Sequence, residues 1–369
     1  MAGAQPARQA WIDMARGGCV LLVVLFHVVI WHLPMLDGDL HAQAWAALNN
    51  FVGGIRMPLL LLLSGMLAAG KVSRGRPALR SAAANYWLYV VWLTIYALVI
   101  PPLHTEAVGT VHPGTDWLVQ LVAPATPLWY IFGLAVFMTG LWLLRSLHVP
   151  IPVILVALLV LTLFVRPGDV IALKVPDLAF YYVLGVWSAP WLKRHVHAQP
   201  WLLLAAGAVL AVTPSIFSRL GMPPMAMSLS FVAGNVGKGL GALAIMAMWE
   251  RWLGALRPLA WVGRRTLSVY VMHPVLLACW IALDMHFGVA SRLVELMGPV
   301  AVIYPALLTI ATAAAALAIE QVVRRGPMEM AFELPKPWMA RLQRWERGPV
   351  AAIDAPARGT STPPAHGTL

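Results

Sequence analysis

The chain has 369 residues, of which 60% are hydrophobic and only 11% are charged, and its mean hydropathy is +0.76. Soluble globular proteins carry about 25% charged residues, so this composition excludes an ordinary soluble protein. The net charge of +11 does not indicate a nucleic-acid partner, because in a membrane protein the placement of Lys and Arg matters more than their sum. The composition predicts an all-α fold, a polytopic membrane helical bundle.

The apolar segments predict about ten transmembrane helices, since a helix needs roughly 20 apolar residues to cross about 30 Å of hydrocarbon. In chain order these segments are 17–34, 50–69, 84–102, 127–146, 149–165, 177–191, 199–216, 225–248, 265–283 and 299–321. With the N-terminus in the cytoplasm, most of the 26 Lys and Arg residues fall on the cytoplasmic side, as the positive-inside rule requires. We therefore expect both termini to be cytoplasmic. Lys238 falls in the middle of the eighth segment and has no evident purpose.

Three regions are predicted along the chain. Residues 1–325 form the transmembrane domain, and residues 326–347 form a cytoplasmic segment. In that segment Trp338 and Trp345 alternate with arginines, a pattern typical of a short helix on an anionic lipid surface. Residues 348–369 are rich in Ala, Pro, Gly, Ser and Thr, which predicts a disordered tail.

The first apolar segment places Arg16 and His27 eleven residues apart. Eleven helical residues return to within about 20° of the same direction after a rise of about 16.5 Å, so one helix face carries both side chains. An ionisable residue inside the bilayer is by default a functional candidate. The alternative is a structural His27 that is hydrogen-bonded to a neighbouring carbonyl, and for a lone histidine that alternative is favoured.

Other candidate residues lie in or beside later segments. Arg56 either binds a carbonyl oxygen or a sugar, or extends to the bilayer surface as a helix-end arginine. The loop with Arg74, Arg76 and Arg80 suits polyphosphate, because arginines form bidentate contacts with phosphate, although topogenic charge explains any one of them equally simply. Trp129 could stack on a sugar, but an aromatic belt at the membrane interface is the commoner explanation.

The ninth segment contains Tyr270, His273 and Pro274. His273 could orient a substrate or the first histidine, or it could bond a carbonyl that the proline frees. No cluster of metal ligands is recognisable in the sequence, so no metal site is predicted.

Taken in chain order, these features form a pattern. The motifs are Asp13 with Arg16-Gly17 and His27, Met57-Pro58 with Ser64-Gly65, Arg76 with Arg80, Leu128-Trp129-Tyr130, and Tyr270 with His273. Over roughly residues 10 to 325 the chain resembles the acyltransferase-3 family of integral-membrane acyltransferases. It departs from the family in the spacing of Arg76 and Arg80, which is four residues where three is usual, and in having Pro127 where relatives often have histidine.

The resemblance implies an activity. Family members transfer an acyl group, often acetyl, from a cytoplasmic donor such as acetyl-CoA to a hydroxyl of a cell-surface glycan or lipid-linked sugar. It assigns the catalytic role to His27, with Arg16 required beside it. It also implies location in the inner membrane, contact with membrane lipids, acyl-CoA as a co-substrate, and no tightly bound cofactor.

A mechanism follows as a hypothesis. Anionic CoA would lie near Arg16, Arg74, Arg76 and Arg80, with its pantetheine arm reaching about 15 Å up the bundle to His27. His27 would act as general base or take the acyl group itself, and Arg56 or Tyr270 would stabilise the oxyanion. His273 and Trp129 belong to the acceptor side.

The competing class is a multi-pass transporter or flippase of a small anion or lipid-linked sugar, which would also place ionisable residues along a membrane path. Its expected mark is an internal repeat of broken helices, and no convincing repeat is visible between residues 1–165 and 177–325. A purely structural or sensory membrane protein is a third possibility, although it would not need the arrangement of Arg16 and His27.

Overall fold

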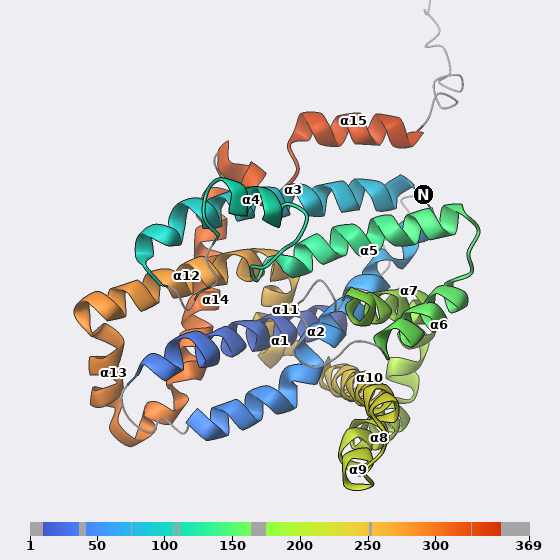
Figure 1. Ribbon diagram of the computed structural model, residues 1–369, viewed down its shortest axis with the longest axis horizontal. Coiled ribbons are helices and arrows are strands. Elements are labelled where there is room, and N and C mark those ends of the chain that lie inside the picture. Colours follow the sequence, from blue (N-terminus) through green and yellow to red (C-terminus); the bar gives the residue numbers. More distant parts are fainter. Residues whose placement is uncertain are drawn as a thin grey trace, which may run out of the picture.

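The computed structural model describes residues 10–36, 42–74, 76–105, 108, 111–163, 175–250, 253–325 and 327–347. Within these ranges every regular element is a helix, which confirms the predicted all-α fold (Figure 1). The predicted disordered tail, residues 348–369, lies outside the described residues.

The long elements follow the apolar segments of the sequence. The first half of the chain contains α1 (Ala10–His27), the π-helix η1 (Val28–His32), η2 (Leu33–Met35), α2 (Ala42–Ser73), α3 (Arg76–Val99), η3 (Pro101–Leu103), α4 (Thr115–Gln120), α5 (Trp129–Ser146) and α6 (Ile151–Thr162). The second half contains α7 (Val175–Ala198), α8 (Pro200–Ala211), α9 (Thr213–Arg219), α10 (Pro224–Trp249), α11 (Leu253–Arg264), α12 (Thr266–Phe287), α13 (Val289–Met297), η6 (Gly298–Ile303), α14 (Tyr304–Val323), η7 (Pro327–Ala331) and α15 (Lys336–Arg347).

Eight helices or helix pairs in the described ranges are long and apolar enough to cross a membrane. They coincide with eight of the ten predicted segments, and the other two segments are the helices α6 and α7. α6 has only 12 residues, about 18 Å of rise, which is shorter than the hydrocarbon core. α7 carries Asp177 near its start and Lys193 and Arg194 near its end, which shortens its apolar stretch. The predicted count of ten is therefore approximate.

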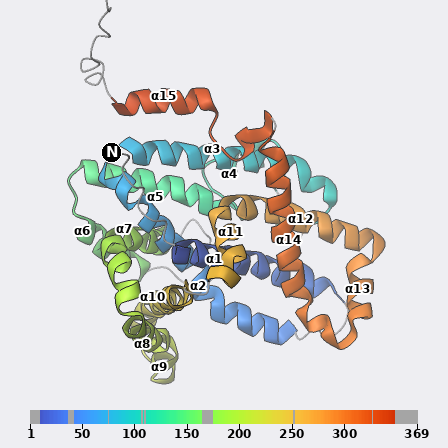
Figure 2. The same ribbon diagram turned by 180° about the vertical axis from the view of Figure 1, so that it is seen from behind.

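The first helix occupies the centre of the molecule (Figures 1 and 2). α1 packs against α2, α10, α11, α12 and α14. Its side chains are buried on most sides, and even Asp13 is only 4% exposed. A helix surrounded in this way can present its residues to an interior site rather than to lipid.

Glycines allow α1 and α11 to touch through their backbones. A Cβ atom added to Gly17 would overlap the carbonyl oxygen of Leu259, and one added to Gly263 would overlap that of Asp13. Small residues at such crossings are the usual means by which membrane helices approach closely. Gly17, the residue after Arg16, is thus needed for packing.

The C-terminal segment folds back on α3. α15 lies along α3 in the antiparallel sense, because Trp345 and Glu346 near its end meet Arg76 and Arg80 at the start of α3 (Figure 1). A turn of η7 precedes it and accepts hydrogen bonds from the indoles of Trp87 and Trp92. The helical part of the prediction for residues 326–347 is confirmed, and its main contact in the structure is with α3.

Candidate active site

His27 stands at a change of helix type. α1 is regular from Ala10 to His27, so the predicted spacing from Arg16 to His27 on one helix holds. The next five residues, Val28–His32, form a π-helix, a rare form that occurs mostly at functional sites. The wider turn brings the Trp31 ring to 4.1 Å from the His27 ring. An aromatic wall therefore lies directly beside the imidazole.

His273 of α12 reaches across to His27. Its Nε2 lies 3.1 Å from His27 Nδ1, and the two ring centroids are 4.9 Å apart. His273 is fully buried, while His27 is partly accessible. The structure thus brings together the two intramembrane histidines that the sequence placed 246 residues apart.

The hydrogen bonds define which nitrogen of His27 carries its proton. The Nδ1 atom lies 2.9 Å from the Val23 carbonyl oxygen, which can only accept, so Nδ1 is the protonated nitrogen of the neutral ring. His273 Nδ1 lies 3.3 Å from the Val269 oxygen and is protonated for the same reason, leaving its Nε2 as an acceptor toward His27. His27 Nε2 therefore keeps its lone pair, and no hydrogen bond occupies it among the described residues.

Three further polar residues extend this pair. The Tyr270 ring lies 5.8 Å from the His273 ring and 5.1 Å from the Tyr130 ring. The Tyr130 hydroxyl lies 2.7 Å from Ser64 Oγ, which donates its proton to the Leu60 carbonyl. Side chains from α1, α2, α5 and α12 thus form one continuous cluster, which we call the His27 cluster: His27, His273, Tyr270, Tyr130 and Ser64.

The Tyr270 hydroxyl is bonded to the backbone. It donates a hydrogen bond to the Pro127 carbonyl, at the turn that precedes α5. The hydroxyl is therefore occupied by backbone and does not face a reacting oxygen. Trp129, which follows this turn, borders a separate cavity of about 250 Å³ with Phe132 and Leu178, and none of its described contacts is with either histidine.

Arg56 lies close to His27 on the α2 side. Its guanidinium carbon is 4.0 Å from the centroid of the Phe26 ring, the residue before His27. Its Nη1 donates to the side-chain oxygen of Asn49 at 2.6 Å and to the Asn49 carbonyl at 3.2 Å. Among the described residues, Nε and Nη2 have no hydrogen bond. Arg56 therefore has a fixed position and spare donors, as a substrate-binding cation requires.

Arg16 precedes His27 by eleven residues on α1, which is about 16.5 Å along the helix axis. Its Nε is buried and has no hydrogen-bond partner in the described part of the chain. A buried donor nitrogen without a partner is unusual, because it loses solvation without a compensating bond.

The predicted donor-site arginines lie apart from this cluster. Arg74 donates to the Gly70 carbonyl at 2.8 Å and is exposed. Arg76 and Arg80 both bind the end of α15, at the carbonyl of Trp345 and the carboxylate of Glu346. The structure therefore groups Arg76 and Arg80 with each other and separates both from His27.

Lys238, which had no assigned purpose, connects two helices. Its Nζ donates to the Phe51 carbonyl at 3.2 Å and lies 5.4 Å from the Phe51 ring centroid. The lysine from α10 thus bonds a carbonyl of α2, and a Cβ atom added to Gly54 of α2 would lie 3.3 Å from its side chain. Lys238 therefore takes part in the packing of α10 against α2.

Sequence reasoning missed a second polar group beyond His27. His32 Nε2 lies 2.8 Å from the Tyr304 hydroxyl, which also accepts a hydrogen bond from the Trp280 indole at 2.9 Å. The position of His32 in the first apolar segment was the available signal. Sequence reasoning also missed the pairing of Ser64 with Tyr130. Nothing in the sequence states that α2 and α5 lie next to each other.

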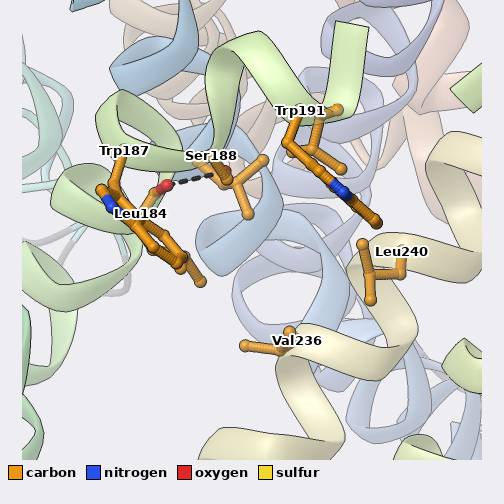
Figure 3. A pocket seen from close by; sticks show the side chains of 8 residues that line it. Leu184, Trp187, Ser188, Trp191, Val236 and Leu240 are labelled. Atoms are coloured by element: carbon orange, nitrogen blue, oxygen red, sulfur yellow. Dashed lines mark hydrogen bonds between the residues drawn. The ribbon is translucent and has the colours of Figure 1, made fainter. Parts of the chain in front are cut away.

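An apolar cavity between α7 and α10 is not lined by residues of the His27 cluster. Figure 3 shows this cavity of about 430 Å³, lined by Trp187, Trp191, Val236 and Leu240. Its one labelled hydroxyl, Ser188, is bonded to the Leu184 carbonyl of its own helix. Within the described ranges no group of three or more His, Cys, Asp and Glu side chains could hold a metal ion.

The fold is a membrane helical bundle with two paired histidines at its centre, and the comparisons with known proteins define its class. The chain matches the acyltransferase-3 family, described as an acyltransferase domain, over residues 9–320. It belongs to that family, as the sequence pattern predicted. It is also 23% identical over 359 residues to the inner membrane protein YcfT of Escherichia coli (strain K12), covering 89% of this chain and 96% of the relative.

Like this relative, the chain is a multi-pass inner-membrane protein. No solved structure matches it.

Proposed function

We propose that this acyltransferase moves an acyl group, acetyl in the first instance, from cytoplasmic acyl-CoA to a hydroxyl of a cell-surface glycan or lipid-linked sugar. The observation that carries the proposal is the hydrogen bonding of His27. Its Nδ1 is tied to Val23 and faces His273, so that Nε2 is left as a base inside the bundle. A neutral imidazole with one free nitrogen is the group that general-base catalysis at a hydroxyl requires.

The proposed reaction uses that nitrogen in two steps. His27 Nε2 takes the proton of the acceptor hydroxyl while the oxygen of that hydroxyl attacks the thioester carbonyl carbon. The carbon–sulfur bond then breaks, and the imidazolium returns the proton to the CoA thiolate. The products are the acyl ester and CoA with a free thiol.

Arg56 is the residue we assign to the oxyanion or to the acceptor. Its guanidinium lies over Phe26, next to His27, and two of its nitrogens have no described partner. A fixed cation beside a developing negative charge stabilises it without reorganisation. Tyr270 is assigned to positioning instead, because its hydroxyl already bonds Pro127.

The donor is assigned to the arginines at the start of α3. Arg76 and Arg80 are one turn apart and present guanidinium groups from one helix face, as recognition of a polyphosphate requires. The exposed Arg74 adds charge beside them. We assign Arg16, whose buried Nε has no partner among the described residues, to the path of the thioester arm toward His27.

The test is transfer of label from radiolabelled acetyl-CoA in membranes that contain the wild type or the His27→Ala variant. We expect alkali-labile label in the glycan or lipid fraction with the wild type and none with His27→Ala, at equal abundance of both proteins in the membrane. His195→Ala is the matched control, since His195 is half-buried and, among the described residues, contacts only Trp191 of its own helix through one hydrogen bond and ring stacking.

Equal labelling by His27→Ala and wild type would remove His27 from the mechanism. If neither protein transfers acetyl, the same comparison with succinyl-CoA decides whether the acyl group or the reaction class was wrong.

A further inference from the structure

The end of α15 presents negative charge to the two arginines of the donor site. Arg80 Nη1 lies 3.0 Å from Glu346 Oε2, and Arg76 Nη1 donates to the Trp345 carbonyl at 2.9 Å. The guanidinium of Arg76 also lies 5.1 Å from the centroid of the Trp345 ring. Both cations that we assign to the donor phosphates are therefore bound by one turn of helix.

This turn resembles an anionic ligand in its chemistry. Trp345 is among the last four residues of α15, whose carbonyls have no partner within the helix and carry the negative end of the helix dipole. Glu346 adds a full negative charge beside that carbonyl. An arginine pair meets here the same combination of oxygens and charge that a phosphate would offer.

The contact between Glu346 and Arg80 leaves part of the carboxylate without a partner. Glu346 is only 13% exposed, and its Oε1 is buried without a hydrogen-bond partner among the described residues. A half-satisfied buried carboxylate loses solvation that one ion pair does not fully return. A ligand with several phosphate oxygens satisfies the same arginines better.

The chain leading to α15 is held more firmly than its end. The indoles of Trp87 and Trp92 donate to the carbonyls of Met330 and Ala331, and Arg324 pairs with Glu333. The two indole bonds fix η7 on α3. Beyond Pro335 the contacts are exposed: Lys336 pairs with Glu329 of η7, and the Trp338 ring lies 6.2 Å from the Trp87 ring. α15 begins immediately after that proline and so can leave α3 while η7 stays in place.

We propose that α15 is a displaceable strap over the donor site, which acyl-CoA must remove from Arg76 and Arg80 in order to bind. The inference rests on the proposed function in one respect, namely that acyl-CoA is the ligand of these arginines. It adds that the protein regulates its own access to the donor.

The first experiment measures the affinity of the purified full-length protein for coenzyme A. We expect Glu346→Gln to lower the dissociation constant about three- to tenfold, because the competing carboxylate is gone, and Arg80→Gln to raise it at least tenfold. Glu329→Gln is the matched control. Glu329 pairs with Lys336 at 3.0 Å in the same segment but touches neither arginine. The dissociation constant of Glu329→Gln for coenzyme A should therefore equal that of the wild type. An unchanged or higher dissociation constant in Glu346→Gln would overturn the proposal.

The second experiment follows α15 itself by limited trypsin digestion at Arg341 and Arg344, both exposed on this helix. We expect coenzyme A to speed cleavage in the wild type, and Glu346→Gln to be cleaved rapidly without it. Protection by coenzyme A would show that α15 closes over the donor and would overturn the proposal. Faster cleavage with coenzyme A but no acyl transfer would support the strap and contradict the proposed function. Acyl transfer with no change in cleavage would support the proposed function and contradict the strap.

Discussion

At the scale of single residues, the histidine pair explains how one imidazole is kept ready to act as a base. His27 alone has the hydrogen bond of an ordinary structural histidine, from Nδ1 to the carbonyl four residues earlier. What distinguishes it is His273, whose Nε2 faces the same Nδ1 and fixes the plane of the ring. Partners of this kind set the tautomer and the orientation of a catalytic imidazole. We therefore propose that His273 is a positioning residue.

The prediction is that His273→Ala lowers kcat about 10- to 100-fold while KM for acyl-CoA stays within about twofold, since the donor site is elsewhere. His273→Gln should recover part of the rate, because its side-chain oxygen can accept from His27 Nδ1. Steady-state kinetics on purified protein checks both variants. Tyr304→Phe, which breaks a comparable bond to His32, is the control and should remain active.

At the scale of elements, the approach of α1 to α11 holds the active-site helix in register. The two backbones touch at Gly17 and Gly263, and neither position has room for a Cβ atom. A shift of α1 at this crossing would carry Arg16 with it. The glycine of the Arg16-Gly17 motif thus contributes to the site through packing.

Gly17→Ala should destabilise the protein by about 1–3 kcal/mol, the usual cost of forcing an extra group into a packed interface. Gly18→Ala is a close control, because an added Cβ atom there meets nothing within 4 Å and alanine favours the helix. Thermal unfolding in detergent compares the two. A lower melting temperature for Gly18→Ala than for Gly17→Ala would refute this account of the crossing.

At the scale of the whole molecule, the number of membrane crossings depends on α6 and α7. Counted as a crossing pair they give ten spans, and without them eight, so both termini lie on one side in either case. Lys193 and Arg194 at the end of α7 are cytoplasmic in either arrangement, so these two basic residues do not distinguish ten spans from eight. The two arrangements differ only in where the connection between α6 and α7 lies.

A cysteine at position 169, introduced as Asp169→Cys in a Cys279→Ser background, should react with a membrane-impermeant maleimide added from outside. The remaining Cys19 is buried and should be silent. Ser146→Cys, at the opposite end of the predicted fifth span, should react only after the membrane is permeabilised. The same behaviour at both positions would favour eight crossings.

The helices were largely predictable because a run of about 20 apolar residues can be recognised in the sequence without knowing what it packs against. Prediction was weakest at α6 and α7, where prolines and charges shorten the apolar run. Within the site, the spacing of Arg16 and His27 could be predicted because both lie on one helix. The pairing of His27 with His273 was only one alternative among several, since no local signal states which helix faces which.

The C-terminal segment shows the same limit more strongly. Its amphipathic pattern predicted a helix, and the helix is present. That its last turn binds Arg76 and Arg80 could not be read from the sequence, because the contact joins residues about 270 positions apart and depends on how the chain folds back. The location of this helix at a lipid surface remains a prediction, and the structure adds its contact with α3.

The separation of His27 from His273 also has a consequence for the biogenesis of the enzyme. The two residues are 246 positions apart in the chain. At a synthesis rate of roughly 5–20 residues per second, the first helix waits about 12–50 s for its partner to emerge. Throughout that time the ring of His27 lacks the contact that orients it, so under the proposed mechanism a partly made chain in the membrane has no complete site.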